Sequence, residues 1–201
     1  MLDDTLCGTS ARQKFTKQVY SGNVSLRIDK FLVGGKVIKQ EIVEHSPSVG
    51  IIPLIGDSEI LFVSQYRNAA GKRLLEIPAG SIEKGETPTR AALREMSEEI
   101  GYVGKLTPIL KMYLAPGYST EYIRIYIAKE LKKTHQINRD DDENIRIRRI
   151  SLDSAIEKCI NGEIQDSKTI AAVLAFDKLI WMSSKSLAHP MQAKDYIKNI
   201  K

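Results

Sequence analysis

Three glutamates, Glu95, Glu98 and Glu99, stand close together in a stretch rich in helix-forming residues. On an α-helix, positions i, i+3 and i+4 share one face, so the three carboxylates come within reach of one small cation. Without a cation this arrangement is unfavourable, because like charges at this spacing repel and anions near a helix C-terminus oppose the helix dipole. The spacing alone leaves two interpretations open, a metal site and a solvated acidic face.

The loop before these glutamates supplies a fourth carboxylate. Gly80 and Gly85 frame a turn, and Glu86 follows it directly. Carboxylate oxygens that enclose an ion only partly are typical ligands of Mg²⁺ or Mn²⁺ rather than of zinc. The loop therefore favours the metal interpretation, with Mg²⁺ as the expected cofactor and Mn²⁺ as its substitute.

Local signals fix both ends of the helix that carries the glutamates. Thr87 suits the N-cap, Pro88 suits the first helical position, and Gly101 suits the C-terminal stop. The sequence therefore predicts one helix between Thr87 and Gly101.

Loop and helix together form a spaced pattern. A glycine is followed after five residues by a glutamate, and after seven more by an Arg-Glu-x-x-Glu-Glu-x-Gly run: Gly80, Glu86, Arg94, Glu95, Glu98, Glu99 and Gly101. This pattern resembles the Nudix box of the Nudix hydrolases, although Met96 and Tyr102 stand where that family usually has aliphatic residues. Over roughly residues 48–182 the resemblance implies an α+β fold, the α/β/α Nudix sandwich with a mixed sheet.

The resemblance also implies roles for the residues of the box. Hydrolysis of a diphosphate requires that its charge be neutralised and that a water lose a proton. Glu95, Glu99 and the backbone carbonyl of Ala79 are the implied metal ligands, and Glu98 is a further ligand or the partner of the catalytic water. Arg94 is expected to hold a loop carboxylate by paired hydrogen bonds rather than to act in catalysis.

A second acidic stretch, residues 140–144, precedes an alternating IRIRRI segment. A charge run is usually a solvated loop, and this remains our interpretation of Asp140. The Nudix hydrolases that cleave ADP-ribose carry an acidic loop at this place in the chain, which supplies an additional metal ligand and the general base. By that resemblance Glu143 is the leading candidate for both roles, with Asp141 and Asp142 as alternatives.

Three segments outside the box resemble those of ADP-ribose pyrophosphatases: Gln65-Tyr66-Arg67, Leu75 to Gly80, and Leu114 to Ser119. Arg67 could grip a phosphate or the terminal ribose, while Glu76 could accept hydrogen bonds from a sugar or pair with a basic group. Pro116 stands fourteen residues after Tyr102, where that subfamily has a marker proline, and Gly117 follows it. Taken singly, these residues also fit a surface arginine, a salt bridge and an ordinary Pro-Gly turn.

The implied function is hydrolysis of ADP-ribose to AMP and ribose 5-phosphate. The same chemistry on GDP-mannose or NADH is an alternative, as is a Nudix module that binds ADP-ribose without cleaving it. Such modules typically lose carboxylates of the box, whereas Glu95, Glu98 and Glu99 are all present here. The adenine contact stays open among Tyr20, Phe31 and Tyr118.

Apolar periodicity supplies the elements that must position these residues. Alternation over residues 13–20, 24–33 and 36–44 predicts a small antiparallel sheet, in which Gly34-Gly35 forms a hairpin turn. We assign residues 1–45 to this sheet, 46–182 to the catalytic domain and 183–201 to a tail. The catalytic domain is expected to contain the following strands and, after them, two helices: 49–55, 60–66, 73–77, 105–114, 122–128 and 145–150, then 152–160 and 168–181.

Composition fits a small enzyme. The chain has 201 residues, 42% of them hydrophobic, which is enough for one sizeable core. Its net charge of +5 is scattered rather than clustered with aromatic residues, so we expect a nucleotide substrate and no nucleic-acid partner. No apolar run is long enough to span a membrane, and the two cysteines, Cys7 and Cys159, favour a reduced, cytoplasmic protein. Because a three-stranded sheet is marginal alone, we also expect a homodimer.

Overall fold

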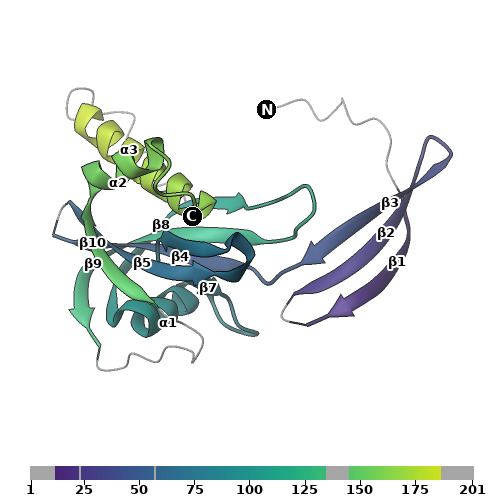
Figure 1. The fold of residues 1–201 in the computed structure, drawn as a ribbon, viewed down its shortest axis with the longest axis horizontal. Helices are drawn as coiled ribbons and strands as arrows, with labels where there is room; N and C mark the ends of the chain where they lie inside the picture. Colours follow the sequence, from purple (N-terminus) through teal and green to yellow (C-terminus); the bar gives the residue numbers. More distant parts are fainter. Residues whose placement is uncertain (1–11, 23, 57, 135–144, 187–201) are drawn as a thin grey trace. The chain divides into compact units, whose positions relative to one another are not determined.

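The computed structural model describes residues 12–22, 24–56, 58–134 and 145–186, and the chain divides into two compact units. The first unit contains residues 1–47 together with 113–122, and the second contains 48–112 and 123–201 (Figure 1). Within the described residues, no helix is long and apolar enough to cross a membrane.

The first unit is built on a three-stranded antiparallel sheet in the order β1-β2-β3. Its strands are β1 (Arg12–Ser21), β2 (Ser25–Val33) and β3 (Lys36–Glu44). Gly34 and Gly35 connect β2 to β3 with φ angles of 54° and 79°, a backbone conformation that glycine adopts without strain. This confirms the separate antiparallel sheet that the alternating pattern predicts.

Residues 113–122 join the first unit through backbone hydrogen bonds to β3. The N–H of Val43 donates to the carbonyl of Tyr118 at 2.7 Å, and the N–H of Thr120 donates to the carbonyl of Val43 at 3.0 Å. No short-range pattern in the sequence indicates this pairing, because its partners are far apart along the chain.

The second unit contains a seven-stranded sheet in the order β10-β5-β4-β9-β8, to which β6 is added on β5 and β7 on β4. Strand β4 runs parallel to β9 and antiparallel to β5 and β7, so the sheet is mixed, as predicted. The strands are β4 (Ser48–Ile55), β5 (Glu59–Arg67), β6 (Lys72–Glu76), β7 (Ala79–Ser81), β8 (Tyr102–Tyr113), β9 (Tyr122–Lys133) and β10 (Arg146–Ser151).

Three of these strands differ from the sequence-based expectation, and one of them is β8, which begins at Tyr102 rather than at residue 105. β7 was not predicted, because its Ala-Gly-Ser sequence has no strand pattern, and it forms by pairing with β4. β9 continues to Lys133 rather than ending at Ala128; four of its last five residues are charged, and the fifth, Leu131, packs against the core.

Helices cover both faces of the sheet (Figure 1). Helix α1 (Pro88–Ile100) lies on one face, and α2 (Leu152–Ile160) and α3 (Ser167–Ser186) lie on the other. Between α1 and the sheet is a core of buried side chains that includes Val49, Ile51, Val63, Met96 and Ile100. This three-layer arrangement confirms the predicted α/β/α sandwich and fixes α1, which carries the acidic residues, against the end of β7.

Candidate active site

Helix α1 begins and ends where the sequence predicts. The hydroxyl oxygen of Thr87 accepts from the N–H of Arg90 at 3.3 Å, and Pro88 occupies the first turn. Gly101 ends the helix in the left-handed conformation, with φ of 73° and its N–H bonded to the last turn. The acidic positions therefore stand on a well-defined helix, and Glu99 is 97% buried from solvent, being only 3% exposed.

Arg94 holds the acidic loop against the helix. Its Nε and Nη2 donate to the two carboxylate oxygens of Glu86 at 3.2 and 3.1 Å, and Nη2 also donates to the carbonyl of Ser81 at 2.9 Å. Its Nη1 donates to Glu95 at 2.8 Å and to Glu98 at 3.0 Å. The hydrogen bond to Glu86, with the other carboxylates nearby, raises the pKa of Arg94, and the same bond lowers the pKa of Glu86. Arg94 thus joins three of the box acids, as expected of a structural clamp.

The end of β7 lies directly against the carboxylates of α1. The N–H of Ala79 donates to Glu99 Oε2 at 3.1 Å. A Cβ atom placed on Gly80 would stand 2.1 Å from the carboxylate carbon of Glu95, so only glycine leaves room for that side chain. The structure therefore brings Ala79, Glu95 and Glu99 together, as the sequence motif implies.

The residues present fit a divalent cation. The guanidinium of Arg94 bonds to three carboxylates, those of Glu86, Glu95 and Glu98, and Glu99 on the same helix adds a fourth, so acidic groups outnumber this basic group. The donors are all oxygens, which Mg²⁺ and Mn²⁺ prefer. Among the described residues no three acidic, His or Cys side chains are grouped tightly enough to enclose an ion, and Arg94 engages the oxygens of Glu95 and Glu98 instead. These bonds to Arg94 use one oxygen of Glu95 and one oxygen of Glu98.

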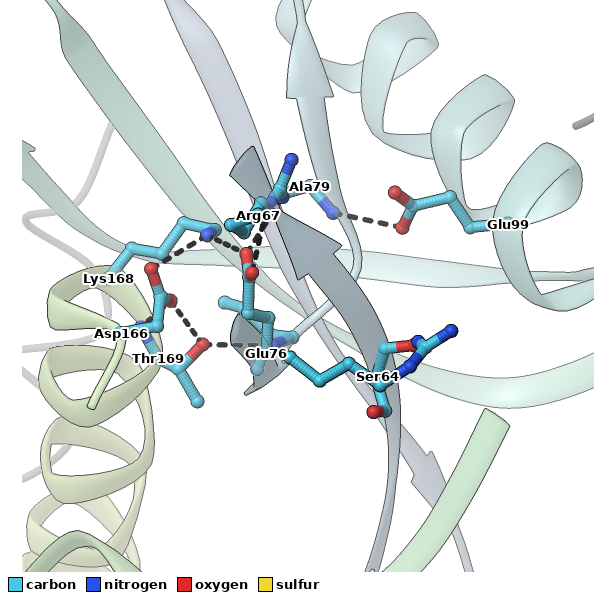
Figure 2. Close-up of polar contacts among 10 residues, drawn as sticks. Ser64, Arg67, Glu76, Ala79, Glu99, Asp166, Lys168 and Thr169 are labelled. Atoms are coloured by element: carbon cyan, nitrogen blue, oxygen red, sulfur yellow. Dashed lines mark hydrogen bonds and ion pairs between the residues drawn. The ribbon is translucent and has the colours of Figure 1, made fainter. Parts of the chain in front are cut away.

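A second polar cluster adjoins this site at the end of β6 (Figure 2). Arg67 Nε and Nη2 donate to the two oxygens of Glu76, each at 2.8 Å, and Lys168 Nζ contacts the same carboxylate. Glu76 is only 1% exposed, whereas 40% of the Arg67 side chain remains exposed. Burial raises the pKa of Glu76, but hydrogen bonds from Arg67 and the charge of Lys168 outweigh it, so the pKa lies below its ordinary value. Glu76 was expected either to accept hydrogen bonds from a sugar or to pair with a basic group, and in the structure it pairs with two basic groups.

Gln65 carries a buried polar atom beside this cluster. The side chain is 9% exposed, and its Oε1 has no hydrogen-bond partner within the described part of the chain. Residues of β5 alternate between faces, so Gln65 shares the α1 face with Val63, a member of the core beneath α1. A buried acceptor of this kind costs roughly 1–3 kcal/mol unless a donor reaches it, which suits a water or a substrate hydroxyl.

Two further sets of candidates were expected from the sequence. Pro116 and Gly117 belong to the first unit, where the carbonyl of Gly117 accepts from Gln40 Nε2 at 3.4 Å. Asp140, Asp141, Asp142 and Glu143 lie outside the described residues.

Sequence reasoning missed the contribution of α3. Asp166 Oδ2 accepts from the N–H of Thr169 at 2.9 Å at the start of this helix. Sequence reasoning assigned no role to Lys168, which is 9% exposed and lies between Asp166 and Glu76. One signal was available: a lysine in the first turn of a helix opposes the helix dipole, so it calls for an acidic partner.

Comparison with known proteins decides the family. Residues 44–173 match the model of the NUDIX domain. The chain belongs to the Nudix family. This Nudix chain is 36% identical to the ADP-ribose pyrophosphatase of Bacillus subtilis (strain 168), covering 78% of this chain and 87% of that protein. It is 39% identical to the methanol dehydrogenase activator of Bacillus methanolicus, and the match covers 79% of this chain and 88% of that protein.

A solved structure described as an ADP compounds hydrolase has the same fold. It superposes with a TM-score of 0.76 and covers 88% of this chain and 96% of its own, at 19% sequence identity. The Nudix fold predicted from the sequence is thereby confirmed.

Proposed function

We propose that this Nudix chain is a divalent-metal-dependent pyrophosphatase that hydrolyses ADP-ribose to AMP and ribose 5-phosphate. The observation that carries the proposal is the meeting of Glu95 and Glu99 with the Ala79-Gly80 strand end, beside the partly exposed guanidinium of Arg67. The similarity to the Bacillus subtilis ADP-ribose pyrophosphatase over most of both chains supports the choice of substrate.

The proposed reaction places each group in a role. A bound Mg²⁺, or Mn²⁺ in its place, would neutralise the diphosphate and make a water more acidic. Glu95, Glu99 and the Ala79 carbonyl would hold the ion, with Glu98 beside them. Glu143 or Asp141 would accept the proton of the attacking water. Water attacks one phosphorus, the bridging P–O bond breaks, and that oxygen leaves on the other phosphate.

Arg67 is the proposed anion-binding residue. The hydrogen bond to Glu76 raises the pKa of the Arg67 guanidinium, so it stays charged. Glu76 takes up one edge of the guanidinium and leaves the other accessible to a phosphate or ribose oxygen. In this proposal Glu76 orients Arg67 and does not itself touch the substrate. Pro116 and Gly117 are proposed to contact the substrate as well.

We further propose a cytoplasmic homodimer. The sheet of the first unit exposes apolar side chains on β1, β2 and β3, including Phe15, Leu32 and Val37, which a second copy of the chain would cover. Cys159 is free and buried, which fits a reducing compartment.

A substrate panel tests the function. Purified protein with Mg²⁺ is incubated with ADP-ribose, GDP-mannose and NADH, and the nucleoside monophosphates released are separated and quantified. We expect ADP-ribose to give the highest kcat/KM. A higher kcat/KM for another nucleotide would agree with the proposed reaction but refute ADP-ribose as the substrate. Tight binding of ADP-ribose without cleavage would indicate a binding module.

A further inference from the structure

The connector between β6 and β7, residues 76–79, is held by hydrogen bonds from several directions. The N–H of Ile77 donates to Thr169 Oγ1 at 2.9 Å, and the N–H of Ala79 donates to Glu99 at 3.1 Å. Pro78 has no N–H, and its carbonyl accepts from the N–H of Ile51 at 2.8 Å. Figure 2 shows the connector between Thr169 of α3 on one side and Glu99 of α1 on the other.

Thr169 is built into the start of α3. Its side chain is fully buried, and its hydroxyl donates to Asp166 Oδ2 while it accepts from Ile77. Asp166 also accepts from the N–H of Thr169 and, through Oδ1, from Lys168 at 2.9 Å. The Thr169 hydroxyl therefore donates its single proton to Asp166 and accepts a hydrogen bond from Ile77, and these two bonds set its orientation.

Charge balance keeps this arrangement in place. Two acids, Glu76 and Asp166, face two bases, Arg67 and Lys168, and all four side chains are joined by ion pairs. Glu76, Lys168 and Asp166 are largely buried, and removing the partner of a buried charge is strongly destabilising. The start of α3 is consequently locked to the last residue of β6.

From these contacts we infer that Thr169, oriented by Asp166, is a positioning residue for the metal site. It holds the connector whose far end presents the Ala79 carbonyl, although it lies on the opposite face of the sheet from the box carboxylates. The inference rests on the proposed function in one respect, that Ala79 is a metal ligand. Groups that orient metal ligands commonly change metal affinity by about 10- to 100-fold when they are removed.

The test is a graded series at position 169. Thr169→Val keeps the shape and removes the hydroxyl, Thr169→Ser keeps the hydroxyl, and Thr169→Cys offers a weak acceptor of similar size. Mn²⁺ binding is measured without substrate, from the signal of free Mn²⁺ in electron paramagnetic resonance. We expect the Kd for Mn²⁺ to rise about tenfold in the Val variant, about threefold in the Cys variant and less than twofold in the Ser variant.

Val173→Ala is the matched control. Val173 is fully buried in the same helix, so the substitution lowers the Tm but removes no hydrogen bond to the connector. It should leave the Kd for Mn²⁺ unchanged. Wild-type Mn²⁺ affinity in a folded Val variant would overturn the inference. If the Val variant does not fold, wild-type affinity in the Cys variant would overturn it.

The readouts separate this inference from the proposed function. If the wild-type protein binds Mn²⁺ but does not cleave ADP-ribose, the proposed substrate is refuted. The Mn²⁺ affinities of the variants at position 169 would still test the positioning role. Cleavage of ADP-ribose with identical Mn²⁺ affinities across the series would support the function and refute the positioning role.

Discussion

The N–H of Ala79 donates to the buried carboxylate of Glu99 at 3.1 Å, which fastens the end of one strand to the helix that carries the acids. Because glutamine retains an oxygen acceptor, Glu99→Gln should keep this bond and the fold while it removes a charge. We expect kcat for ADP-ribose at saturating Mg²⁺ to fall at least about 100-fold. Without metal, the Tm should rise slightly as repulsion among the glutamates is relieved. Near wild-type turnover would contradict the assignment of Glu99.

Gly80→Ala tests the close approach of Glu95 to the chain. The new Cβ would displace a flexible carboxylate rather than backbone, so the protein should fold. We expect at least a tenfold weaker Mn²⁺ affinity, of the size seen when a ligand is misplaced. Ser81→Ala, one residue on and exposed, is the control that should bind Mn²⁺ normally. Equal affinities in both variants would show that Glu95 is not a ligand.

Substitutions of Glu143 and of Asp140 should differ in their effect on kcat. Glu143→Gln should lower kcat severely while ADP-ribose still binds with nearly normal affinity, because a base or additional ligand acts mainly on the transition state. Asp140→Asn should change kcat little. Single-turnover rates and equilibrium binding of ADP-ribose measure the two effects separately. Small and equal effects would mean that residues 140–144 are a solvated acidic loop.

Glu76 should make stability depend on pH in the acid range. Its pKa in the folded protein lies below the ordinary 4.5, so its stabilising effect is complete above that pH. The effect is lost as the pH falls through the lower, folded-state pKa. Glu76→Gln should cost about 3 kcal/mol at neutral pH, since it leaves Arg67 and Lys168 short of a partner.

The measurement for Glu76 is urea unfolding at a series of pH values. The difference in the free energy of unfolding between the wild type and Glu76→Gln should be largest at neutral pH and should become smaller at acid pH. Glu157→Gln, an exposed change on α2, should give a small difference that does not vary in this way. A constant difference for Glu76→Gln would mean that the loss comes from packing rather than from charge.

Removal of residues 1–44 tests the assembly. It deletes β1, β2 and β3, and with them Val43, whose backbone pairs with Tyr118 and Thr120. We expect a monomer with much weaker ADP-ribose affinity that still binds Mn²⁺. Light scattering and Mn²⁺ titration measure the two properties. A full-length protein that is monomeric at enzyme concentrations and turns over normally would refute the dimer.

Local chemistry explains how much of this structure could be predicted. Helix α1 is delimited by Thr87, Pro88 and Gly101, each of which acts within one turn of chain, so its ends were predictable. The same holds for the turn at Gly34-Gly35. By contrast, the contact of Lys168 with Glu76 joins residues 92 positions apart, and no periodicity reports such a pairing. The role of α3 therefore emerged only from the fold.

The bridge between β3 and residues 113–122 also sets an order of events in the growing chain. The partners of Val43 are Tyr118 and Thr120, so the first unit cannot complete its hydrogen bonds until Nudix helix α1 and strand β8 have been synthesised. Closing such a long loop is entropically costly and slow compared with forming a hairpin. Strands β1 to β3 therefore leave the ribosome before the residues that pair with Val43, and the backbone of β3 stays without these two hydrogen bonds until residues 118–120 follow.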